Sequence, residues 1–194
     1  MEIKRLNKGE EGRAIAVLAE AMYDDPVLSW LFPDPEGRTR AMPYAMGHFT
    51  SRAMATDRVL MDGADQAASL WFLQGGGAPP ATSDEDPVGG GAAPEAFVPY
   101  MERLDLLGRI VTERRPAEPH LYLSVIGTLP EARGRGLGGA LLGHRLSDNE
   151  LPAYLEASSP RSRELYLRHG FEPHGDPIRL PDGPTVYPMR RPAP

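Results

Sequence analysis

The sequence contains no cysteine among its 194 residues. This absence excludes disulfide bonds, a thiolate nucleophile and cysteine metal ligands together, and no metal site is expected. The N-terminus, Met1 to Arg5, lacks the apolar stretch of a signal peptide. No apolar run approaches the roughly 20 residues needed to span a bilayer. These absences predict a cytoplasmic protein without a membrane partner.

Positive charge is also scarce. The chain has 21 lysine and arginine residues against 27 aspartate and glutamate residues, a net charge of −6. Nucleic-acid binders usually carry a basic excess, so no nucleic-acid partner is expected, whereas an acidic surface favours cationic partners. The length and the 41% apolar content suit one globular core. Residues 1–194 are therefore predicted to form a single domain.

The first half of the chain predicts helices followed by a hairpin. A short strand is expected at residues 2–6, and a first helix follows it and stops at Asp24-Asp25-Pro26. A second helix is expected from about Pro35 to Thr56, with an interruption near Pro43. Residues 59–73 predict a β-hairpin, because two apolar runs flank a turn signal.

The second half begins after a segment of different composition. Glycine, proline and acidic residues fill positions 75–95, which predicts a flexible loop that buries no core. A helix is expected from about Pro99 to Arg114, and strands are expected at 121–126 and 153–157. A helix from Pro160 to His169 and two last strands complete the chain. This order predicts a mixed α/β fold with helices on the faces of a sheet.

The sharpest local feature is a glycine-arginine loop at residues 133–139, between a predicted strand and a predicted helix. Glycine lets the backbone approach a ligand closely, and a helix N-terminus offers unpaired N–H groups and partial positive charge. Together they predict a pyrophosphate site. A plain surface turn is the simpler alternative. A dinucleotide site is another, because Gly134-x-Gly136-x-x-Gly139 fits that fingerprint and Glu156 lies about 20 residues on.

The dinucleotide alternative is disfavoured by position, because Gly127 to Ala132 separate the strand from the first glycine of the fingerprint. Instead, Arg133-x-x-Gly136-x-Gly138 resembles the Gln/Arg-x-x-Gly-x-Gly/Ala signature of the GNAT acetyltransferases. The flanking segments 122–130, 152–158 and 165–171 are similar to that family's central strand, next strand and closing helix. The nearest branch is that of puromycin N-acetyltransferase. The resemblance is good from about Pro119 to Arg191 and weaker before residue 75.

The resemblance implies a GNAT fold, with a central, mixed, mostly antiparallel sheet that is splayed at the cofactor site and flanked by helices. It implies acetyl-CoA as the cofactor, with the pantetheine arm along a strand edge and the pyrophosphate in the glycine loop. The residues so implied as cofactor contacts are Ile126, Gly127, Thr128, Arg133, Gly134, Arg135, Gly136, Leu137, Gly138, Gly139, Ser162 and Tyr166. Ser162 stands where many relatives have asparagine. The segment from Gly139 to Pro152 is short, which predicts a helix end near residues 144–146.

Two residues are the candidate catalytic groups. Tyr166 would protonate the departing thiolate, and the simpler alternative is that its ring only packs under the sheet. Glu156, at a strand end, would accept the proton that an ammonium must lose before it attacks. The alternatives for Glu156 are an ion pair with an arginine such as Arg161, a base role for His144 or His169, and an amine that arrives already neutral.

The acceptor is expected to be a small cationic amine, such as an antibiotic or another amine-bearing metabolite. Candidate contacts at its entrance are Asp24, Asp25, Trp30, Phe32 and Tyr44. Core packing is the simpler role for the two aromatics Trp30 and Phe32, and a helix stop is the simpler role for the two aspartates. A protein or peptide acetyltransferase and a non-catalytic acyl-CoA sensor remain as alternative functions, and the chain is expected to act as a monomer or homodimer.

Overall fold

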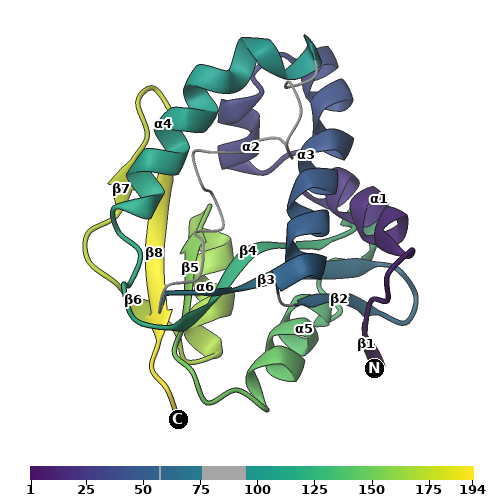
Figure 1. Ribbon diagram of the computed structural model, residues 1–194, viewed down its shortest axis with the longest axis vertical. Helices are drawn as coiled ribbons and strands as arrows, with labels where there is room; N and C mark the ends of the chain where they lie inside the picture. The colour runs from purple at the N-terminus through teal and green to yellow at the C-terminus, as the bar shows by residue number, and fades with distance from the viewer. Residues whose placement is uncertain (57, 76–94) are drawn as a thin grey trace.

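The computed structural model describes residues 1–56, 58–75 and 95–194 (Figure 1). Most of the segment predicted to be a flexible loop, residues 76–94, lies outside the described residues. The described strands form one sheet in the order β1-β2-β3-β4-β5-β8-β6, and β7 also pairs with β8. Every pairing is antiparallel except the one between β4 and β5. This architecture confirms the predicted mixed α/β fold with a mostly antiparallel sheet.

The bounds of the elements follow the chain order shown in Figure 1. The strands are β1 (Ile3–Arg5), β2 (Arg58–Asp62), β3 (Ala67–Gln74), β4 (His120–Thr128), β5 (Ala153–Ala157), β6 (Glu172–Pro173), β7 (Ile178–Arg179) and β8 (Thr185–Arg191). The α-helices are α1 (Glu11–Ala21), α2 (Pro26–Leu31), α3 (Pro35–Thr56), α4 (Met101–Thr112), α5 (Leu137–Leu146) and α6 (Pro160–Arg168). Two 3-10 helices, η1 (Glu95–Tyr100) and η2 (Pro130–Ala132), precede α4 and the glycine loop.

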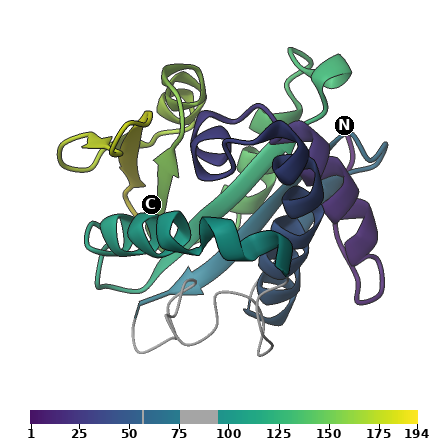
Figure 2. The same ribbon diagram turned by 90° about the horizontal axis from the view of Figure 1, so that it is seen from above.

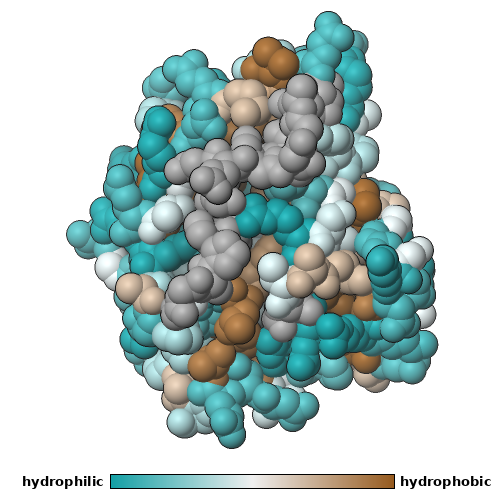
Figure 3. Space-filling model, viewed as in Figure 1, coloured by the Kyte–Doolittle hydropathy of each residue, from teal (hydrophilic) through white to brown (hydrophobic). Residues whose placement is uncertain are grey.

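Alternating side chains on the strands divide the interior into two cores, one on each face of the sheet. On β3, Leu70 and Phe72 join α1, α2 and α3 in the first core, whereas Ala67 and Trp71 face α5 and α6 in the second. On the face shown in Figure 3, hydrophilic residues cover most of the surface of the described residues. Figures 1 and 2 show α4 reaching from α3 toward the β7–β8 edge of the sheet. Within the described residues, no helix combines the length and apolar character that crossing a bilayer requires.

The predicted end of the first helix before Asp24-Asp25-Pro26 is confirmed, whereas the predicted interruption of the second helix near Pro43 was wrong. The segment Asp24-Asp25-Pro26 ends α1 but also begins α2, because Asp25 Oδ1 accepts hydrogen bonds from the backbone N–H groups of Val27 and Leu28 at 2.9 and 3.2 Å. Helix α3 is continuous through Pro43. Proline removes one backbone hydrogen bond, and packing of the buried face of α3 against the first core outweighs this loss.

Gly127 on β4 sets how closely α1 packs on the sheet. A Cβ atom at this position would lie 2.8 Å from the Ala21 Cβ and 3.2 Å from a Leu18 methyl group. We expect Gly127→Ala to lower the free energy of unfolding by about 1–3 kcal/mol, the usual cost of overpacking. Chemical denaturation measures this change. Gly143→Ala on α5, where an added Cβ meets nothing within 4 Å, is the control; equal stability of the two variants would contradict the packing argument.

Candidate active site

The sheet opens between β4 and β5. Strand β4 pairs with β5 only from Leu121 to Leu123, while its other edge pairs with β3 as far as Thr128. A register shift opposite the Leu70–Trp71 step leaves Ser124 without a partner on β3, which is the mark of a β-bulge and bends the strand. Leu123 pairs with Leu155, and after this pair β5 remains paired with β8 but no longer with β4. Among the described residues, no strand pairs with this edge of the backbone from Ser124 to Thr128, and the edge faces the opening.

A cavity of about 820 Å³ fills this opening. The same edge of β4 forms one wall, the loop before α5 and the start of α6 form another, and α2, α3 and α4 close the far side. The predicted site residues that line this cavity are Asp24, Asp25, Ile126, Gly127, Thr128, Arg133, Gly134, Gly136, Leu137, Gly138, Gly139, Glu156, Ser162 and Tyr166. One space thus brings together every predicted cofactor residue except Arg135, both predicted catalytic residues and two predicted acceptor contacts.

The glycine loop turns sharply into α5. Gly134 and Gly136 both have φ of 81°, in the left-handed region, and Gly136 is the residue at the start of the helix. The first backbone bond of α5 runs from the Ala140 N–H to the Gly136 carbonyl at 3.0 Å. The N–H groups of Leu137, Gly138 and Gly139 therefore have no acceptor within the helix, and all three residues line the cavity. This geometry suits a bound anion.

The arginines around this end of the cavity divide into two kinds. Arg133 donates to the backbone carbonyls of Ala21 at 3.0 Å and Thr128 at 3.3 Å, and so ties the end of α1 to the end of β4. Arg161 and Arg168 of α6 line the cavity and are exposed. Arg135, a predicted cofactor contact, is exposed and does not line the cavity. These arginines therefore place positive charge at the end of the cavity near α5, although the chain as a whole has a net charge of −6.

Tyr166 belongs both to the second core and to the cavity. Its ring packs edge-on against Phe171, with 5.9 Å between ring centroids, and the residue is 6% exposed. No hydrogen bond joins its hydroxyl to another residue of the described chain. Burial, reinforced by the nearby Asp25 carboxylate, raises the pKa of Tyr166, so the phenol keeps its proton at neutral pH. The structure therefore combines the packing role with a protonated group at the cavity wall.

Glu156 lies at the cavity in a buried network of three side chains. Its carboxylate accepts a hydrogen bond from the Tyr122 hydroxyl at 2.8 Å and pairs with Arg115, with 3.4 Å between Oε1 and Nε. Arg115 also donates to the Tyr122 oxygen at 2.8 Å and stacks over the Tyr122 ring. The glutamate and arginine side chains are 8% and 7% exposed. Burial raises the pKa of Glu156, and the arginine and the tyrosine offset part of that rise.

Asp25 is held rigidly beside Tyr166. While Oδ1 starts α2, Oδ2 accepts a hydrogen bond from Ser158 at 2.5 Å and so joins α2 to the end of β5. Burial raises the pKa of Asp25, against the hydrogen bonds that lower it.

Asp24 is exposed at the cavity. Ser162 lines the cavity, but its hydroxyl completes a capping box with Ser159 at the start of α6.

Three predicted acceptor contacts lie away from the main cavity. Trp30 is buried, and its Nε1 donates to the Pro181 carbonyl at 2.8 Å. Phe32 is completely buried and packs edge-on against Phe97 and Tyr100. Tyr44 packs against Phe97 and, with Phe32, lines a separate small hollow of about 20 Å³. The placement of Trp30 and Phe32 thus matches the core-packing alternative, and no local pattern distinguishes the aromatic residues that reach the cavity from those that do not.

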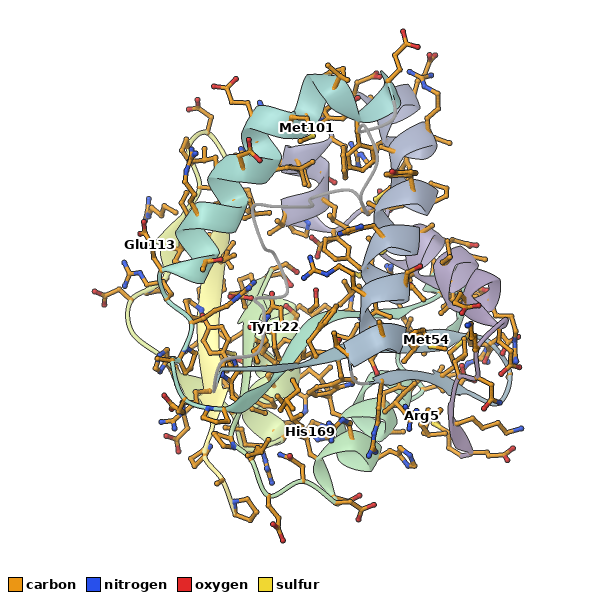
Figure 4. All side chains as sticks on the ribbon, in the orientation of Figure 1. Arg5, Met54, Met101, Glu113, Tyr122 and His169 are labelled. Carbon is orange, nitrogen blue, oxygen red and sulfur yellow. The ribbon has the colours of Figure 1, made fainter. Side chains whose placement is uncertain are left out.

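The histidine alternatives for the base are also placed elsewhere. His144 is exposed on α5 and does not line the cavity. His169 follows α6 and packs against Gly139, where an added Cβ would lie 3.1 Å from Nε2. Figure 4 shows His169 well apart from Tyr122, which lies near the centre of the sheet. Among the described residues, no group of three or more potential metal ligands gathers.

The sequence interpretation missed two residues of the site, Arg115 and Tyr122. Arg115 follows α4 and lies 41 positions before Glu156, so no local spacing connects them. The Tyr122 side chain lies on the face of β4 that packs in the first core, where a tyrosine usually has only a packing role. The available signal was the alternation on β4 and β5, which places Tyr122 and Tyr154 opposite each other and Glu156 two residues further on the same face.

Comparison with protein families gives a match to the acetyltransferase (GNAT) family over residues 56–171. The chain belongs to the GNAT family of acetyltransferases. The matched region contains the splayed strands, the glycine loop, Glu156 and Tyr166, and most of the cavity. The prediction that the chain is an acyltransferase of this family is thereby confirmed, while its placement near the puromycin N-acetyltransferase branch stays a prediction.

Solved structures share this GNAT fold over the whole chain. One, described as histone acetyltransferase HPA2 and related acetyltransferase from Corynebacterium glutamicum, is 24% identical, with a TM-score of 0.70 and coverage of 99% of this chain and 96% of the other. A polyamine N-acetyltransferase from Drosophila melanogaster is 17% identical, with a TM-score of 0.66 and coverage of 97% and 98%. A mosquito arylalkylamine N-acetyltransferase-like protein is 16% identical, with a TM-score of 0.65 and coverage of 98% of each chain. At these identities the similarity establishes the fold.

Proposed function

We propose that this GNAT protein transfers an acetyl group from acetyl-CoA to the primary amine of a small molecule, by direct attack with both substrates bound together. One observation carries the proposal. A single cavity joins a helix N-terminus with free N–H groups and a strand edge to a buried carboxylate and a buried phenol. The two small-amine acetyltransferases named above, with their similar folds, are consistent with this acceptor class.

The residues present fit coenzyme A. The free N–H groups of Leu137, Gly138 and Gly139 would hold the pyrophosphate, and the bare glycine backbone lets a phosphate approach closely. Arg161 and Arg168 add positive charge beside them. The edge from Ser124 to Thr128 would pair with an extended amide-bearing arm as an added strand does. Acetyl-CoA supplies an activated acetyl thioester to this site.

The remaining chemistry belongs to the chain. An N–H group on the fixed β4 edge would stabilise negative charge on a carbonyl oxygen, because it is oriented before the reaction begins. Glu156 would accept a proton from the acceptor ammonium, and its raised pKa makes it a stronger base than an ordinary glutamate. Tyr166, protonated at neutral pH, would donate its proton to the departing sulfur and regain one from the attacking nitrogen, which must lose a second proton to become an amide. The buried network of Tyr122 and Arg115 fixes the Glu156 carboxylate in place.

The test couples binding to turnover. Calorimetry with acetyl-CoA measures binding, and release of free thiol on addition of primary amines measures transfer. The proposal expects both. Binding without transfer to any acceptor would favour the acyl-CoA sensor, and transfer only to peptide amines would favour the protein acetyltransferase. An antibiotic acceptor, the cytoplasmic location and the monomeric or dimeric state remain predictions of the sequence.

The loop geometry makes a separate prediction about cofactor affinity. Gly136→Ala places a side chain at φ 81°, which costs about 1–2 kcal/mol and displaces the start of α5. We expect acetyl-CoA binding to weaken by roughly tenfold, measured by calorimetry. Gly9→Ala imposes the same kind of strain at φ 96°, before α1 and away from the cavity. That control should lose stability and keep its affinity; equal losses of affinity in both variants would contradict the assigned role of the loop.

A further inference from the structure

One face of α4 forms an apolar stripe that leads directly to the candidate base. Leu104, Leu107, Gly108 and Val111 follow helical spacing, and all four line the cavity. The chain then continues to Arg115, which contacts Glu156 and Tyr122. An acceptor whose amine meets Glu156 therefore has its body against this stripe.

The opposite walls of this compartment are apolar too. Leu28 and Leu31 come from α2, and Met46 and Phe49 come from α3. Leu28, Leu31, Phe49 and Leu104 line both the main cavity and the small second hollow, so a further small apolar hollow lies behind this wall. Gly108 adds room, because a Cβ there would meet nothing within 4 Å. The compartment can thus enclose a hydrocarbon chain or ring.

Negative charge is scarce in the same compartment. Among the described residues that line the cavity, the carboxylates are those of Asp24, Asp25 and Glu156. Both Asp25 oxygens already accept hydrogen bonds, and Asp24 is exposed to solvent. Glu156 is the buried carboxylate beside the stripe, and Arg115 already balances part of its charge. A second ammonium along the stripe would lose its hydration, and no carboxylate of the described residues lies on the stripe to pair with it.

We infer that the acceptor is a monoamine with an apolar body, rather than a diamine or polyamine. This inference rests on the proposed function and narrows its substrate class. The amine binds beside Glu156, and the hydrocarbon body extends between α2, α3 and α4. Binding of the body comes from burial of its apolar surface, so acceptor strength should follow chain length and fall when a second charge is added.

A homologous series tests the apolar body. We expect kcat/KM for straight-chain primary alkylamines, from propylamine to hexylamine, to rise by roughly fourfold for each methylene group until the compartment is full. Thiol release at saturating acetyl-CoA gives these values. A flat series, or one that falls with length, would overturn the inference.

A pair of amines of equal size tests the charge. Hexylamine and cadaverine have the same number of non-hydrogen atoms, and cadaverine replaces the terminal methyl group with a second amine. We expect hexylamine to have at least a tenfold higher kcat/KM, the ratio produced by loss of about 1.4 kcal/mol. This holds despite the twofold statistical advantage of a diamine. Equal or better turnover of cadaverine would overturn the inference.

A variant of Gly108 tests where the body lies. Gly108→Leu fills open cavity space on α4, and leucine favours a helix more than glycine does, so the fold should persist. We expect it to lower kcat/KM for hexylamine by at least tenfold and to leave propylamine within threefold. Gly143→Leu is the matched control, an exposed helical glycine on α5 that does not line the cavity. Equal effects of Gly108→Leu on both amines would overturn the placement, and the measurements on the unmodified chain do not depend on this variant.

The outcomes also separate the two proposals. If no primary amine is acetylated while acetyl-CoA binds, the proposed function fails and the inference with it. If amines are acetylated but cadaverine equals hexylamine, the proposed function stands and only the substrate class is wrong.

Discussion

Replacing Tyr166 with phenylalanine is expected to lower kcat by roughly 10²- to 10⁴-fold, the usual contribution of a positioned acid. The substitution removes only the hydroxyl. The ring would keep its edge-on contact with Phe171 and its place in the second core. Because no hydrogen bond joins the hydroxyl to the described chain, its removal leaves no protein partner unsatisfied. Stability and acetyl-CoA affinity should therefore stay near those of the parent, measured by thermal unfolding and calorimetry.

The leaving group provides a sharper form of this test. Loss of a proton donor should slow transfer least from acyl donors whose departing thiolate is already stable. Activated acetyl thioesters of low thiol pKa should therefore recover part of the lost rate with Tyr166→Phe. Tyr187→Phe is the matched control, a tyrosine of β8 in contact with the same core that does not line the cavity. A Tyr166→Phe variant with unchanged kcat would show that the phenol only packs.

Replacing Glu156 with glutamine is expected to lower kcat/KM for amines by about 10²- to 10⁴-fold, because the shape is kept and the base is lost. The pH dependence should change as well. A base must be deprotonated to act, so the rate of the parent rises with pH as Glu156 loses its proton. Burial raises the pKa of Glu156, which moves this rise to higher pH than for an ordinary glutamate. In a plot of rate against pH, the Glu156→Gln variant should lack this rising part, the acid limb.

Three further measurements separate the acid limb of Glu156 from other effects on the rate. The acceptor amine also titrates, so amines of different pKa should shift their own limb and leave the Glu156 limb unchanged. Removing the carboxylate leaves Arg115 buried without its anion, which destabilises the fold by itself. Unfolding must therefore be measured alongside rate. Glu118→Gln removes a carboxylate from an exposed pair with Arg190 and should leave rates unchanged. An acid limb that persists in Glu156→Gln would exclude Glu156 as the base.

The parts of the site that depend on short stretches of chain were predictable from the sequence. The glycine loop and the start of α5 follow from local residue types, because glycine and the helix terminus set the backbone directly, whereas the end of α5 at Leu146 agrees with what the family resemblance implied. The strands β4 and β5 follow from apolar runs. The family resemblance added the splay between them, which no local pattern encodes.

The parts that depend on distant contacts were not predictable. Arg115 meets Glu156 across 41 positions, and Asp25 meets Ser158 across 133. Asp24-Asp25-Pro26 predicts the end of the first helix but not the start of α2, because an aspartate before proline is typical of both a helix end and a helix start. Trp30 and Phe32 show the same ambiguity, since an aromatic side chain in an apolar run suits a cavity wall and a core equally well.

Mass spectrometry of the products tests the central claim most directly. Purified protein is incubated with acetyl-CoA and hexylamine, and both N-acetylhexylamine and free coenzyme A are quantified. The account predicts equal amounts of the two products from the parent chain and at least a hundredfold less with Tyr166→Phe. Folded protein that binds acetyl-CoA but yields no acetylated amine, from hexylamine or any other primary amine, would contradict it.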